Sequence, residues 1–88
     1  MRIKDNLVLK EIAGAYVVLP IGTATVDFTG ILTLNESGAM LWRLINDGYD
    51  SEQLTEALVN EYEVSMEQAR LDVDEFIDKL NSANCLDI

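Results

Sequence analysis

The sequence predicts an α+β domain in which a small sheet is followed by helices. Residues before position 35 alternate between apolar and polar types and are rich in β-branched and aromatic side chains, as in strands. Residues after that position place apolar side chains three and four apart, as in amphipathic helices. Between the two halves stands Asn35, a residue type that caps helices. All 88 residues are expected to form one domain.

The first two predicted strands form a hairpin. Residues 7–12 alternate loosely, and Tyr16–Leu19 is rich in β-branched and aromatic side chains. The small residues Ala13–Ala15 interrupt the pattern between them, which is typical of a hairpin turn. Pro20 is expected to end or bend the second strand.

The segment from residue 24 to residue 34 carries the next strand pattern and allows two interpretations. In the first, Asp27–Gly30 is a tight turn that leads into a short strand, Ile31–Leu34. In the second, one unbroken strand runs through Gly30. The turn is favoured because glycine adopts a positive φ without steric cost.

Three helices are predicted in the second half. The first runs from about Asn35 to Asp47 and stops at Gly48. Asp50 or Ser51 caps the second helix and Ser65 caps the third; a glutamine three residues after Asp50 and after Ser65 has capping-box spacing. Side chains expected in the core are Leu41, Trp42, Leu44 and Ile45, then Leu54, Ala57, Leu58 and Tyr62, then Met66, Ala69, Val73, Phe76 and Leu80. The predicted order is strands followed by three helices, and a short turn joins the last two helices. This order indicates a winged helix-turn-helix arrangement.

The charge of the chain argues against nucleic acid and membranes as partners. Sixteen acidic residues oppose six basic ones, a net charge of −10, which repels phosphate backbones and anionic lipid headgroups. The third helix, which would read DNA in a winged helix, carries mainly carboxylates. Its charged residues include Glu67, Asp72, Asp74, Glu75 and Asp78, against Arg70 and Lys79.

The sequence has no residues that predict catalysis. Histidine is absent, which excludes an imidazole base, Ser-His and Cys-His pairs and His-containing zinc sites. The run Asp72–Glu75 lacks the glycine and the ligand spacing of a calcium loop, so it is interpreted as a solvated acidic face. Cys85 lies in an apolar tail and is interpreted as a packing residue. We therefore expect a non-enzyme without catalytic residues, metal ligands or cofactors.

The sequence also lacks membrane and export signals. Residues 1–6 precede no long apolar run, and no stretch approaches the ~20 apolar residues of a membrane span. A cytoplasmic protein is expected.

One strand of the predicted sheet is suited to pair with another chain. Ile31–Leu34 has no Lys, Pro or inward charge, the usual protection of an edge strand, so its N–H and C=O groups could receive an extended peptide. Arg70, Asp74 and Ile77 form a mixed margin beside the core stripe of the third helix, and that margin would read the peptide side chains. The alternative is a short edge strand that is simply tolerated.

The junction between sheet and helices resembles the Leu-Asn-x-x-Gly-x-x-x-Trp signature of PqqD-like proteins, named for pyrroloquinoline quinone biosynthesis protein D. The matching residues run in order through Leu32, Thr33, Leu34, Asn35, Glu36, Ser37, Gly38, Ala39, Met40, Leu41 and Trp42. Upstream, Tyr16–Val18 is similar as well, and so downstream are Ser51–Leu54, Tyr62–Val64 and Asp72–Phe76. The resemblance extends from about Leu7 to Leu86.

This resemblance implies a three-stranded antiparallel sheet followed by a three-helix bundle, and a binding module without chemistry of its own. Members capture the leader of a ribosomally synthesised, post-translationally modified peptide precursor by strand addition between the third strand and the third helix. They present it to a modifying enzyme, commonly a radical S-adenosylmethionine enzyme, which this chain would recruit in trans. The implied peptide-binding positions are Ile31, Leu32, Thr33, Leu34, Arg70, Val73, Asp74 and Ile77.

A second function class stays open beside this one. A structural or oligomerisation domain would use the same unprotected strand to pair with its own copy. The sequence therefore leaves the oligomeric state, monomer or dimer, undecided.

Overall fold

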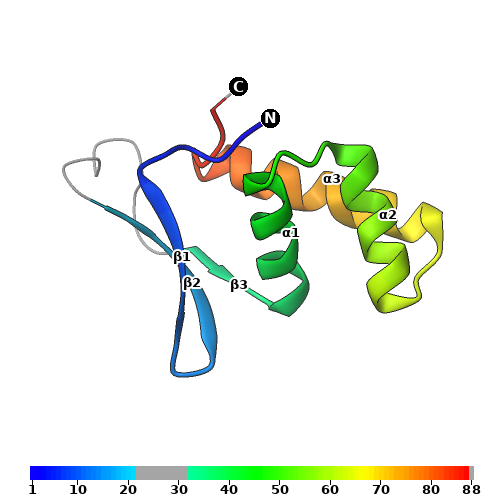
Figure 1. The fold of residues 1–88 in the computed structure, drawn as a ribbon, viewed down its shortest axis with the longest axis horizontal. Helices are drawn as coiled ribbons and strands as arrows, with labels where there is room; N and C mark the ends of the chain where they lie inside the picture. Colours follow the sequence, from blue (N-terminus) through cyan, green and yellow to red (C-terminus); the bar gives the residue numbers. More distant parts are fainter. Residues whose placement is uncertain (22–31, 88) are drawn as a thin grey trace.

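A computed structural model describes residues 1–21 and 32–87, which form a three-stranded antiparallel sheet followed by three helices (Figure 1). The elements are β1 Leu7–Ile12, β2 Ala15–Pro20, β3 Leu32–Leu34, α1 Glu36–Asn46, α2 Ser51–Tyr62 and α3 Met66–Ser82. The strands lie in the order β1-β2-β3, so β3 is an edge strand. The expected α+β class is confirmed. The expected turn at Asp27–Gly30 lies outside the described residues.

The hairpin between β1 and β2 closes with a two-residue turn. Ile12 pairs with Ala15, and the residues between them, Ala13 and Gly14, have φ of 52° and 83°. Positive φ at both central positions is the mark of a type I′ turn, whose twist matches that of the flanking strands. Glycine adopts this conformation freely, whereas the Cβ of Ala13 is strained in it.

The predicted helix starts are confirmed by their hydrogen bonds. The Asn35 side chain accepts from the Gly38 N–H at the start of α1, and Asp50 and Gln53 form a complete capping box at the start of α2. At the start of α3 the Ser65 hydroxyl accepts from the Gln68 N–H. Each cap satisfies an N–H that the first helical turn leaves without a partner.

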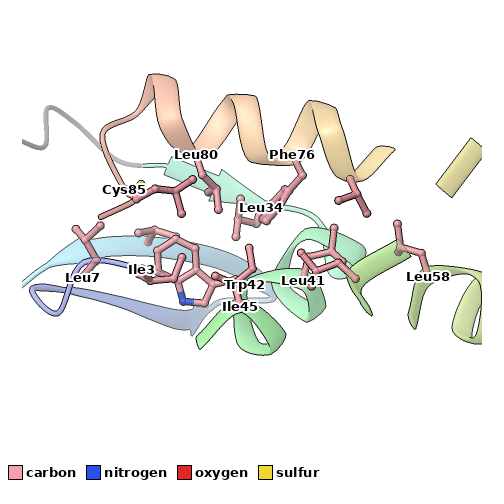
Figure 2. Close-up of a cluster of buried hydrophobic side chains, with 14 of the residues drawn as sticks. Ile3, Leu7, Leu34, Leu41, Trp42, Ile45, Leu58, Phe76, Leu80 and Cys85 are labelled. Atoms are coloured by element: carbon pink, nitrogen blue, oxygen red, sulfur yellow. The ribbon is translucent and has the colours of Figure 1, made fainter. Parts of the chain in front are cut away.

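The core lies where the inner face of the sheet, α1 and α3 meet. Figure 2 shows Phe76 and Leu80 pointing from α3 towards Leu34, with Trp42 and Ile45 of α1 below them. Trp42, Ile45 and Leu80 are at most 1% exposed, as their helical spacing predicts. The largest fully buried side chains are Trp42, Ile45, Leu54, Leu80, Val18, Val73 and Cys85.

Two side chains of the predicted stripes are exposed. Met66 is 44% exposed because it is the first residue of α3, where the helix has not yet reached the core. Tyr62 is 38% exposed because it is the last residue of α2. In both cases the apolar spacing extends to a helix end beyond the reach of the sheet.

The two ends of the described chain are joined. Ile3 forms an antiparallel bridge with Leu86, the Lys4 N–H donates to the Cys85 carbonyl at 2.9 Å, and Figure 1 shows the two ends side by side. Cys85, next to this bridge, is fully buried. Burial raises the pKa of its thiol, and the Lys4 ammonium opposes this with a smaller lowering effect. Cys85 is therefore a packing residue, as its apolar surroundings in the sequence predict.

Replacing Ala13 with Asn should stabilise the domain, because Asn tolerates the left-handed conformation of a type I′ turn better than Ala does. We expect a gain on the order of 1 kcal/mol, visible as a rise of roughly 4–8 °C in the melting temperature. The matched control is Ala15→Asn, an exposed neighbour in an extended strand, which should bring no gain. An equal rise for both variants would contradict the assignment of strain to the turn.

Candidate functional site

A groove of about 890 Å³ lies between β3, the start of α1 and one side of α3. Its floor is largely apolar, and its rims carry polar and charged side chains. The lining residues are Thr33, Leu34, Asn35, Glu36, Ser37, Gly38, Leu41, Leu58, Tyr62, Val64, Asp72, Glu75, Phe76 and Lys79. The groove thus starts at the end of β3, on the free edge of the sheet, and extends to the end of α2.

The backbone of Thr33 points into this free edge. On β1, the Leu7 N–H donates to the Lys4 carbonyl at 3.2 Å and therefore points away from β2. The directions of the backbone N–H and C=O groups alternate from residue to residue along antiparallel strands. The register of the hairpin therefore directs both groups of Val17 in β2 towards β1. Its partner Thr33 must then direct both its N–H and its C=O away from β2.

A lysine side chain confirms the outward direction of the Thr33 carbonyl. Lys79 Nζ on α3 donates to the Thr33 oxygen at 3.4 Å, across 46 residues of sequence. This long hydrogen bond is exposed to solvent, where such contacts contribute little stability. It marks the place where α3 faces the edge of β3, and it occupies an acceptor that a new strand would use.

The floor of the groove depends on a glycine. A Cβ at Gly38 would lie 3.1 Å from Asn35 Oδ1 and 3.2 Å from Phe76 Cε1. The missing side chain therefore lets the Phe76 ring of α3 pack onto the first turn of α1. Leu34 is buried beside them, so β3, α1 and α3 meet at this point.

The rims of the groove are mainly acidic. Asp72 and Glu75 lie on α3 and Glu36 lies on α1, while Lys79 is the one cation among the described lining residues. Asp72 accepts a hydrogen bond from the neutral Gln68 amide at 2.9 Å. At the far end, partial burial and the Glu36 carboxylate are the main causes that raise the pKa of the Tyr62 phenol.

Of the predicted strand residues, Thr33 and Leu34 line the groove and Leu32 does not. Thr33 is exposed on the edge, Leu34 is buried in the floor, and Leu32 is half-buried beside Val18. Ile31 lies outside the described residues.

The predicted helix wall needs correction. Val73 is 1% exposed and belongs to the core, and Ile77 is half-buried against it. Arg70 and Asp74 line a separate cavity of about 350 Å³ at the start of α2, away from β3. The expectation that Arg70 and Asp74 stand beside the edge strand is therefore wrong.

The residues of α3 that line the groove are on the other flank of the same core stripe. Asp72, Glu75 and Lys79 follow one another at spacings of three and four, so they form one row on α3. This row is visible in the sequence, but its spacing is equivalent to that of Arg70, Asp74 and Ile77. Only the packing of α3 in the folded domain shows which of these two rows lines the groove.

Metal-binding clusters and membrane-spanning helices are both absent from residues 1–21 and 32–87. No three His, Cys, Asp or Glu side chains are placed there to hold a metal ion. No helix in this part of the chain is both long and apolar enough to cross a membrane.

Comparisons with known proteins agree with the fold. The family model of coenzyme PQQ synthesis protein D (PqqD) matches residues 15–86. TbiB1, solved in complex with the TbiA(beta) leader peptide, is 25% identical with a TM-score of 0.80, over 99% of this chain and 95% of that one. No curated protein matches the sequence significantly.

A second solved structure shares the fold. It is a lasso peptide synthetase B1, complexed with the leader peptide. This protein is 21% identical with a TM-score of 0.74, and the match covers 92% of this chain and 89% of that one. The two proteins are alike in fold.

Replacing Asn35 with Ala should destabilise the domain, because the Gly38 N–H loses its 2.8 Å acceptor. We expect the free energy of unfolding, measured by urea titration, to fall by about 1 kcal/mol. Asn35→Asp, which keeps the accepting oxygen, should retain most of that free energy. If both variants unfold at the urea concentration of the parent chain, the cap does not hold this junction.

Proposed function

The chain belongs to the PqqD family, and from that premise we propose that it binds the leader segment of a ribosomally synthesised, post-translationally modified precursor peptide. The leader adds to the sheet as a strand along β3 and fills the groove beside α3. The observation that carries this proposal is the free edge of β3, whose outward Thr33 backbone groups lie beside an open, largely apolar groove.

Strand addition fits the chemistry of this edge. The incoming backbone would supply partners for the Thr33 N–H and C=O, and alternate side chains would enter the floor formed by residues such as Leu41 and Phe76. Main-chain hydrogen bonds provide affinity, and the pockets for side chains provide selectivity. TbiB1, one quarter identical over almost the whole chain, is itself solved with a leader peptide, which supports the same use here.

We assign the chain a binding role without catalysis. The groove offers carboxylates, one lysine, one phenol and hydroxyl and amide groups, but no histidine or thiol, and Cys85 is buried elsewhere. Chemistry on the bound precursor would then belong to a modifying enzyme, for which a radical S-adenosylmethionine enzyme is the candidate that the family suggests. The chain's net charge of −10 makes nucleic acid an unsuitable ligand.

Replacing Thr33 with Pro should weaken leader binding at least about tenfold, because Pro removes an N–H that points into the groove. The fold should survive, since proline is tolerated on edge strands when that N–H faces outward. Isothermal titration with a precursor leader peptide measures the affinity, and circular dichroism checks the fold.

The matched control is Glu11→Pro, which removes an outward N–H from the opposite edge of the sheet. Its affinity for the leader should equal that of the parent chain. Equal binding by all three proteins would refute strand addition at β3. Sedimentation without peptide tests whether β3 pairs instead with a second copy of the chain. A concentration-dependent dimer that forms in the parent chain and not in Thr33→Pro would show this self-pairing.

A further inference from the structure

The groove has an uneven distribution of charge along α3. Lys79 stands at the end where α3 meets Thr33, and Glu75 and Asp72 follow one and two turns towards the start of the helix. Glu36 faces the same groove from the first turn of α1. A peptide in the groove therefore meets one cation near Thr33 and carboxylates farther along.

These carboxylates have no basic partner within the described chain. Among residues 1–21 and 32–87 the single ion pair joins Arg2 and Asp5, far from the groove in sequence. Asp72 has only the neutral Gln68 amide, and Lys79, the nearest basic residue on the same helix row, bonds to the Thr33 carbonyl instead. A basic ligand would complement the charge of this rim.

The apolar floor defines the rest of the ligand. Phe76, Leu41 and Leu58 line the groove below the carboxylates. A strand turns alternate side chains to opposite faces, so a side chain that enters this floor has neighbours two residues away on the same face. Long basic side chains suit the rim, because their methylene stems cover apolar surface while the charge stays near water.

We propose, on the basis of the function proposed above, that the groove selects leaders with an apolar-basic pattern. Apolar side chains of the bound strand enter the floor, and a Lys or Arg pairs with Asp72 and Glu75. Glu75 and Asp72 lie four and seven residues before Lys79 on α3, and a helix rises less per residue than a strand does. The basic residue of the peptide is therefore expected about two or three positions from the peptide residue that pairs with Thr33. The backbone N–H of the latter residue displaces Lys79 from the Thr33 carbonyl.

A selection from random peptides tests this pattern without a choice of leader in advance. The full chain is immobilised, a library of random peptides of about twelve residues is selected on it, and the selected peptides are titrated individually. We expect peptides that lose affinity on Thr33→Pro and that share a Lys or Arg two or three residues from an apolar position. Their affinity for an Asp72→Asn, Glu75→Gln double variant should fall by about fivefold for each lost ion pair.

A matched double variant separates the groove from the general charge of the chain. Glu67→Gln with Asp78→Asn removes the same charge from exposed positions of α3 that do not line the groove. Its affinity for the selected peptides should stay within about twofold of the parent value. Equal losses in the two double variants would overturn the proposed pairing, because attraction to the overall negative charge would then explain the basic residues.

The remaining outcomes distinguish this inference from the function on which it rests. Peptides that depend on Thr33 but show no basic preference would overturn the apolar-basic pattern and leave strand addition intact. If every selected peptide binds Thr33→Pro as well as the parent chain, strand addition at β3 fails, and the pattern fails with it.

Discussion

The hydrogen bond from the Gly38 N–H to the Asn35 side chain is the contact on which the junction between sheet and helices depends. It begins α1 directly after β3 ends, with no intervening loop. Leu34 on one side and Gly38 on the other are both buried, and the Phe76 ring of α3 packs over Gly38. One short segment therefore holds an edge strand, a helix start and α3 at fixed positions.

The same junction explains why a groove remains beside the strand. β3 is only three residues long and turns at once into α1, so α3 can approach its end at Phe76 while Lys79 reaches only the Thr33 carbonyl through a long side chain. The Leu-Asn-x-x-Gly-x-x-x-Trp signature is then mainly structural, because its residues provide the core, the cap and the close approach that keep the edge accessible.

Local signals in the sequence were sufficient to predict most of the fold. The caps at Asn35, Asp50 and Ser65 and the hairpin around Gly14 each depend on residues a few positions apart, so their physics can be read locally. The flank of α3 that lines the groove could not be predicted in this way. The core stripe through Val73 has two flanks with the same spacing, and only tertiary packing places Asp72 and Glu75 in the groove and Arg70 beside the start of α2.

Amide hydrogen exchange at Thr33, followed by NMR as leader peptide is added, tests strand addition most directly. If the leader pairs with β3, the exposed Thr33 N–H becomes protected at saturation, and the amides of residues 72–79 shift in the same titration. Little change is expected at Glu11, whose N–H faces the opposite edge of the sheet. An unprotected Thr33 N–H at saturation, or shifts confined to Arg70, Asp74 and the start of α2, would contradict strand addition at this edge.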